Sequence, residues 1–182
     1  MPSHTRLVAV DEFARIPDDD FRYELVAGRV IRMSPMGGVH GVTVLWLGGL
    51  LADWARVHDR GAVMTETGFV LATNPDTVRA PDISFGRRGR IPSDGIPSGF
   101  WPSPPDLAVA VLSPDDRPSD TLGKVDEYLT IGVLLVWVVD PRGRTVTVYR
   151  TGTEPIVLGA VEVLEGNEIL PEFALPLREL FP

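Results

Sequence analysis

The side chains that could carry out hydrolytic chemistry are a scattered set of carboxylates and one amine. The carboxylates are Glu24, Asp82 and Asp120, and the amine is Lys124, the only lysine among 17 basic residues. Hydrolysis of a phosphodiester with Mg²⁺ uses such groups: oxygen ligands hold the metal, the metal activates a water, and an ammonium stabilises the charge that develops. Two carboxylates about 4 Å apart repel by about 4 kcal/mol at an effective dielectric near 20. We therefore expect a cation beside any such cluster.

Other kinds of catalytic machinery are absent from the sequence. It contains no GxxxxGK[ST], GxGxxG or GxSxG motif, and it has no cysteine, which excludes thiol nucleophiles and disulfides. The three histidines, His4, His40 and His58, lack the spacing of a zinc site. No apolar run reaches the length needed to span a bilayer, so we expect no membrane association and a cytoplasmic location.

The net charge of −8 opposes binding of nucleic acid through bulk charge, but it is unevenly distributed. Residues 151–182 contain six glutamates and one arginine, a local charge of −5, which leaves −3 for the other 150 residues. The basic cluster at residues 79–90 lies in this less acidic part. A polyanion can therefore be bound locally.

The elements that must position these residues follow from apolar periodicity. The runs DLAVAVLSP (106–114) and VLLVWVVDP (133–141) are typical of strands buried on both faces, and a helix is predicted between them over residues 117–131. A hairpin is predicted in YELVAGRVIRM (23–33), and a loop is predicted over residues 90–105. A second helix is predicted over residues 39–58, with Val42, Trp46, Leu50, Trp54 and Val57 on its core face.

This order of elements predicts an α+β (mixed α/β) fold with a central mixed sheet flanked by helices. One domain is expected over residues 1–182, with an acidic C-terminal extension at about 151–182.

Six segments, in order over roughly residues 10 to 150, resemble the Uma2 (DUF820) family of restriction-endonuclease-like proteins, which belongs to the PD-(D/E)xK nuclease superfamily. They are RYELVAGRVIRMSP with His40 shortly after, RAPDISF, PPDLAVAVLSP, the spacing of Asp120, Lys124 and Tyr128, GVLLVWVVDP, and TVTVYR. The resemblance implies a restriction-endonuclease-like fold, DNA as substrate, Mg²⁺ or Mn²⁺ as cofactor and a homodimer.

The resemblance also implies roles for individual residues. It assigns metal binding to Asp82, and catalysis to Glu24, Asp82 and Lys124. Glu24 and the backbone carbonyl of Val111 are further candidates for metal ligands. His40 and Asp120 are candidates for supporting residues or substitute ligands. The family typically has glutamate where this chain has Ala110, so one metal ligand and one negative charge are missing.

Each candidate also has a structural interpretation. Asp82 after Pro81 is common in turns, and Asp120 and Lys124 can form a surface pair worth about 0.3 to 0.5 kcal/mol. Glu24 can pair with Arg22 or Arg32, and His40 can cap or pack the start of a helix. Arg87 and Arg88 are either part of a solvated loop or contacts to a phosphate backbone near Asp82.

Three hypotheses remain open at this point. The first is an Mg²⁺-dependent endonuclease, impaired by Ala110. The second is a nuclease fold that no longer cleaves and binds nucleic acid or protein. The third is a structural protein with no active site.

Overall fold

The computed structural model describes residues 6–16 and 21–181. The helices are α1 (Val10–Phe13), α2 (Gly38–Val57), α3 (Pro118–Thr130) and α4 (Leu177–Leu180), with a 3₁₀ turn at Arg88–Arg90 (η1). The first six strands are β1 (Arg22–Val26), β2 (Arg29–Met33), β3 (Gly61–Thr65), β4 (Phe69–Ala72), β5 (Thr77–Arg79) and β6 (Ile83–Arg87). The other six are β7 (Leu107–Val111), β8 (Leu135–Asp140), β9 (Thr145–Tyr149), β10 (Ile156–Gly159), β11 (Val163–Gly166) and β12 (Leu170–Pro176).

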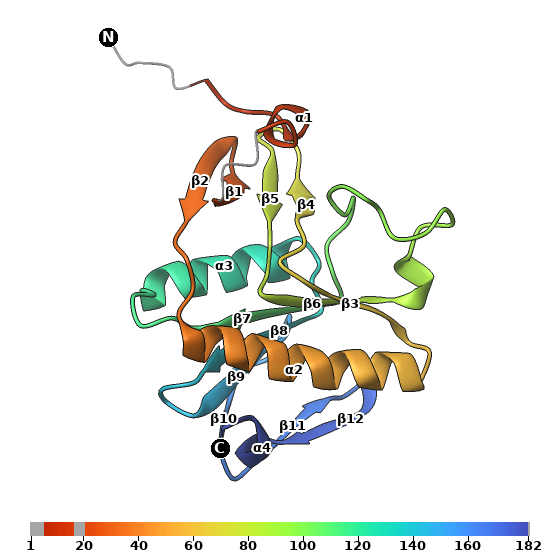
Figure 1. Ribbon diagram of the computed structural model, residues 1–182, viewed down its shortest axis with the longest axis vertical. Coiled ribbons are helices and arrows are strands. Elements are labelled where there is room, and N and C mark those ends of the chain that lie inside the picture. Colours follow the sequence, from red (N-terminus) through yellow and green to blue (C-terminus); the bar gives the residue numbers. More distant parts are fainter. Residues whose placement is uncertain (1–5, 17–20, 182) are drawn as a thin grey trace.

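The central sheet has six strands in the order β10-β9-β8-β7-β6-β3 (Figure 1). β7 and β8 run parallel, and the other neighbours are antiparallel, so the sheet is mixed as predicted. Parallel strands need a crossover connection, and α3 is part of the connection from β7 to β8. This places the helix that carries Lys124 directly after the strand that carries Ala110.

The two long helices cover opposite faces of this sheet. Val109 and Val111 of β7 pack in one apolar cluster with residues of α2, whereas Ala108 packs in another with Val125 and Tyr128 of α3. Successive side chains of a strand point to opposite faces, so Ala110 lies on the α3 face. β7 and β8 are continuous apolar runs because both of their faces are covered.

A second sheet, in the order β2-β1-β5-β4, lies beside the central one and carries Glu24 in β1. β5 ends at Arg79 and β6 begins at Ile83, so residues 80–82 lead the chain from one sheet to the other. Asp82 therefore lies at the junction of the two sheets.

The described part of the acidic segment, residues 151–181, packs onto the main core. Its apolar residues join the cluster formed with α2, among them Leu164, Leu170, Leu177 and Phe181. Its six glutamates are exposed, and β11, β12 and α4 lie at the end of the molecule opposite β1 and β2 (Figure 1).

The face of α2 that turns to the core differs from the predicted one. Of the five residues predicted to be buried, only Trp54 is, at 8% exposed, whereas Trp46 is 53% exposed. The buried face includes Leu47, Gly48 and Leu51 instead. The prediction failed because α2 is apolar on both faces, so periodicity alone could not select one. Across the described residues, no helix is both long and apolar enough to cross a membrane.

Candidate active site

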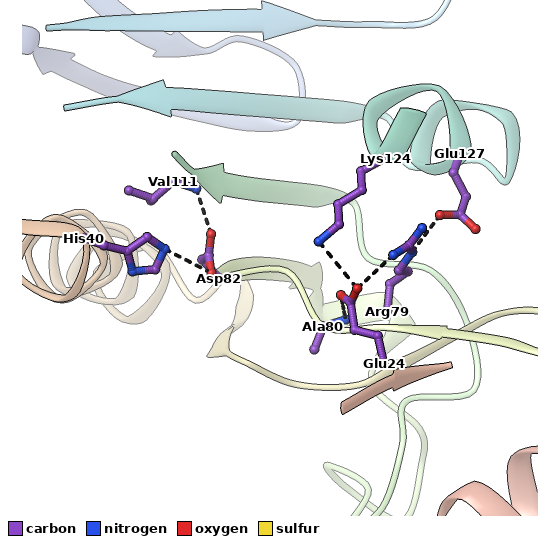
Figure 2. Close-up of polar contacts among 8 residues, drawn as sticks. All are labelled: Glu24, His40, Arg79, Ala80, Asp82, Val111, Lys124 and Glu127. Carbon is purple, nitrogen blue, oxygen red and sulfur yellow. Dashed lines mark hydrogen bonds and ion pairs between the residues drawn. The ribbon is translucent and has the colours of Figure 1, made fainter. Parts of the chain in front are cut away.

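Asp82 is fixed by contacts from two elements at the junction of the sheets. Its Oδ2 accepts a hydrogen bond of 2.7 Å from the backbone N–H of Val111, at the end of β7. Its Oδ1 lies 3.3 Å from Nε2 of His40, in the first turn of α2 (Figure 2). The side chain is mostly buried, so its position is set by the protein and not by solvent.

His40 is 5% exposed, and its Nε2 makes no hydrogen bond within the described part of the chain although the Asp82 oxygen is near. The direction from Nε2 to that oxygen therefore does not suit a hydrogen bond. A buried polar atom without a partner costs about 1 to 3 kcal/mol. Such an atom in a native structure calls for an explanation, such as a missing ligand.

Glu24 is 3% exposed, and both of its oxygens are held by donors of the protein. Oε1 accepts a hydrogen bond of 3.2 Å from the N–H of Ala80. Oε2 lies 2.8 Å from the Arg79 guanidinium and 3.4 Å from Nζ of Lys124. Figure 2 shows this carboxylate between the two cations. The structure therefore brings Glu24 and Lys124 together, as the resemblance implied.

Arg79 links Glu24 to α3. Its Nε donates a hydrogen bond of 2.7 Å to Glu127, three residues after Lys124. Burial opposes the charge of Arg79, but Glu24 and then Glu127 outweigh it and raise the pKa of the guanidinium. Sequence reasoning missed Arg79 and Glu127. The helical spacing of Lys124, Glu127 and Tyr128 was a signal for Glu127, because residues three and four apart share a helix face.

A small cavity of about 80 Å³ lies between β7 and α3, with room for about two to three water molecules. Its lining includes Asp82, Ala110, Lys124, Asp120 and Tyr128. A longer side chain at Ala110 would enter this space. A wider cavity of about 820 Å³ is lined by Glu24, Arg79 and Lys124 among others. Lys124, Asp116 and Asp120 line both cavities, so the two spaces adjoin each other.

Tyr128 lies in α3 one turn after Lys124 and is buried. Burial, followed by the nearby carboxylates of Glu24, Asp82 and Glu127, raises the pKa of its phenol well above the ordinary value. The phenol therefore stays protonated at neutral pH.

Two of the sequence candidates do not reach Asp82. Arg87 and η1, which begins at Arg88, lie at the opposite end of β6, and five strand residues span about 16 Å. Asp106 accepts a hydrogen bond of 2.8 Å from the Arg87 backbone, and Arg88 pairs with Asp59 at 2.8 Å. Arg87 and Arg88 are therefore close to Asp82 in sequence but not in space.

The described part of the chain holds no group of three or more histidine, aspartate or glutamate side chains that could bind a metal ion. Asp82 nevertheless offers Oδ1, which lies 3.3 Å from Nε2 of His40. The N–H and C=O of one strand residue point to the same side, so the Val111 carbonyl lies on the Asp82 side of β7. The carboxylate and this carbonyl are oxygen donors of the kind that a divalent ion binds.

A family model, Uma2, described as "Putative restriction endonuclease", matches residues 10–178. The chain belongs to the Uma2 family. Its fold is similar to that of a solved structure described as a "putative nuclease belonging to DUF820" from Anabaena variabilis ATCC 29413, with a TM-score of 0.85 at 23% identity. The likeness covers 96% of this chain and 97% of the other. No curated protein matches the chain.

Membership of Uma2 confirms the family that the six segments indicated, and the structural likeness confirms the restriction-endonuclease-like fold. Together they support a nuclease-like function. At 23% identity the likeness to the solved structure supports only the fold. The roles of individual residues in this chain therefore rest on the geometry described above.

Proposed function

We propose that this Uma2 protein is a metal-dependent endonuclease that hydrolyses DNA phosphodiester bonds, impaired with Mg²⁺ because Ala110 replaces the motif glutamate. The observation that carries the proposal is the meeting of Asp82, Lys124 and Glu24 around linked cavities, although they come from three separate elements. A purely structural role would not require a buried carboxylate and an amine beside an open space.

Asp82 and the Val111 carbonyl would hold the metal. A bound Mg²⁺ or Mn²⁺ supplies neutralisation of phosphate charge and a lower pKa for its bound water. Lys124 stabilises negative charge on the phosphate as the P–O bond breaks. Glu24 holds the ammonium in place, and Arg79 holds Glu24, so both act as positioning residues.

DNA reaches this site through the wider cavity. Arg32 and Lys124 on its lining can contact phosphate oxygens, and a bound metal would offset the five carboxylates that also line it, those of Glu24, Asp115, Asp116, Asp120 and Glu127. Five of the six exposed glutamates of residues 151–181 lie in or beside β11, β12 and α4, at the end of the molecule opposite β1 and β2 (Figure 1). The acidic segment therefore opposes DNA mainly at long range, where salt screens it.

The test is nicking of supercoiled plasmid with Mg²⁺ or Mn²⁺. Asp82→Asn keeps an acceptor for the Val111 N–H but removes the charge, and we expect it to lower cleavage at least a hundredfold. The control is Asp94→Asn, the same change at an exposed loop residue, which leaves cleavage unchanged. Cleavage that survives Asp82→Asn would contradict the assignment of the site.

The second candidate function is a DNA-binding protein that no longer cleaves, and Ala110 favours it because one metal ligand is missing. In that case the natural chain binds DNA at the same cavity without cutting it with either metal. Lys124→Ala then weakens DNA binding. Metal-dependent cleavage by the unmodified chain rules this function out.

We also propose a homodimer in which the exposed face of α2 meets a second copy. Residues 38–52 carry no aspartate, glutamate, lysine or arginine, and Leu45 on this face is 72% exposed. Gly41 and Gly49, one turn to either side, leave open space where a side chain would be. Two antiparallel copies of α2 can therefore place each Leu45 beside a glycine of the other without burying an unpaired charge.

A further inference from the structure

The feature that the proposed mechanism leaves unused is the buried ring of His40. Its Nε2 has no hydrogen bond, lies 3.3 Å from Asp82 Oδ1 and belongs to a side chain that is 5% exposed. Figure 2 shows the ring directed from α2 toward Asp82. Among the described residues, Nε2 therefore has the Asp82 contact but no hydrogen bond, and it has little access to solvent.

The separation between the two atoms suits a shared metal ion. Two ligands about 2.1 Å from one ion lie about 3.0 Å apart when they are adjacent in an octahedral site. They lie about 3.4 Å apart in a tetrahedral site. The observed 3.3 Å falls between these values, so an ion can bridge His40 and Asp82 with little movement of either side chain.

Other carboxylates are poorer substitutes for the missing glutamate. Asp116 uses Oδ2 to accept a hydrogen bond of 2.6 Å from Ser113, and Asp120 is exposed and accepts one from the Ser119 hydroxyl. Both line the small cavity, but neither forms a metal-binding group with Asp82 among the described residues. His40 is already in contact with the aspartate.

We propose that His40 Nε2 is a direct ligand of the metal at Asp82 and takes the place of the carboxylate lost at Ala110, so that the site prefers Mn²⁺ over Mg²⁺. The inference rests on the proposed function for the identity of the site. Imidazole nitrogen suits transition metals, whereas Mg²⁺ prefers oxygen ligands and releases its water reluctantly. Exchange of a carboxylate for an imidazole therefore lowers the affinity for Mg²⁺ more than the affinity for Mn²⁺.

The experiment measures metal binding without DNA. Mn²⁺ is titrated into the full chain and followed by electron paramagnetic resonance, Mg²⁺ affinity is obtained by competition, and pulsed measurements detect coupling of the bound Mn²⁺ to a ¹⁴N nucleus. We expect such coupling from one imidazole in the natural chain. His40→Gln abolishes it and lowers Mn²⁺ affinity at least tenfold, with a change of less than threefold for Mg²⁺.

The matched control is His58→Gln, because His58 is exposed at the end of the same helix. This variant keeps both the coupling and the affinity. Suppose that the natural chain binds Mn²⁺ without ¹⁴N coupling and that Asp82→Asn abolishes the binding. This result overturns the role of His40 but leaves the metal site at Asp82 intact. Coupling that persists in His40→Gln also overturns it. If the natural chain binds no Mn²⁺, both this inference and the metal dependence of the proposed nuclease fail.

Discussion

Glu24→Gln tests whether Glu24 positions the two cations or binds the metal. The substitution removes one negative charge but keeps an amide oxygen that can accept the Ala80 N–H. Arg79, 11% exposed, is left with Glu127 alone, and Lys124 loses the carboxylate 3.4 Å away. Removing one member of a buried pair costs about 3 to 5 kcal/mol. Because Arg79 keeps Glu127, we expect the lower value, about 3 kcal/mol.

The assay is thermal and urea unfolding at pH 7, together with Mn²⁺ titration. For a chain of this size a loss of about 3 kcal/mol lowers the Tm by about 6 to 12 °C. The control, Glu66→Gln, removes the half-exposed partner of Arg22 and costs less than about 1 kcal/mol. In a double-mutant cycle with Arg79→Met, the two losses add to more than the loss in the double variant, because both break the same contact.

A positioning role also requires that Mn²⁺ affinity change less than twofold in Glu24→Gln, while plasmid cleavage falls because Lys124 is no longer held. The opposite pattern refutes the reasoning. If Mn²⁺ affinity falls as far as in Asp82→Asn while the free energy of unfolding is unchanged, Glu24 is a metal ligand and the ion pairs contribute little.

Three further outcomes are expected. Ala110→Glu restores a carboxylate at the small cavity, and we expect it to raise Mg²⁺ affinity at least tenfold by calorimetry and to increase cleavage with Mg²⁺; unchanged Mg²⁺ affinity would show that the cavity does not adjoin the metal. Leu45→Glu converts the dimer to a monomer in light scattering, whereas Leu122→Glu, at an exposed apolar position of α3, does not; a natural chain that is monomeric contradicts the proposed interface. The raised pKa of Tyr128 leaves its contribution to stability intact below about pH 10, but above that the unfolded chain ionises first, so stability falls by about 1.4 kcal/mol per pH unit more steeply than in Tyr128→Phe; equal slopes in urea unfolding from pH 9 to 11 contradict burial of the phenol.

The central strands and α3 could be predicted from sequence because their environment leaves a clear pattern. β7 and β8 are covered on both faces, which demands the continuous apolar runs seen at residues 107–111 and 135–140. α2 shows the opposite case. Its two faces are nearly equally apolar, and the selection between them depends on which side chains fit against β6 and β7, a tertiary property. Gly48, for instance, is buried opposite Ile83.

The site residues that belong to short sequence motifs could be predicted, whereas the ion pairs between distant segments could not. Asp82 and Lys124 follow from short spacings, but the bonds of Arg79 join residues 55 and 48 positions away in sequence, to Glu24 and Glu127. No local pattern records such pairs. For Arg87 the sequence was misleading in the opposite way. It lies close to Asp82 in sequence, but the extended strand β6 separates the two residues in space.

Charge at the site connects Ala110 to both proposed functions. Six acidic and four basic side chains line the two cavities, which leaves two negative charges; the acids are Glu24, Asp82, Asp115, Asp116, Asp120 and Glu127, and the bases are Arg22, Arg32, Arg79 and Lys124. A glutamate at position 110 would make it three. At about 8 Å and an effective dielectric near 20, that extra charge opposes a phosphate by on the order of 2 kcal/mol. With alanine, the metal-free site repels DNA less, and a site loaded with a divalent ion is neutral where the family pattern would hold one net negative charge. In the proposed site, the same substitution that weakens the hold on Mg²⁺ therefore also lowers the electrostatic repulsion of a phosphodiester.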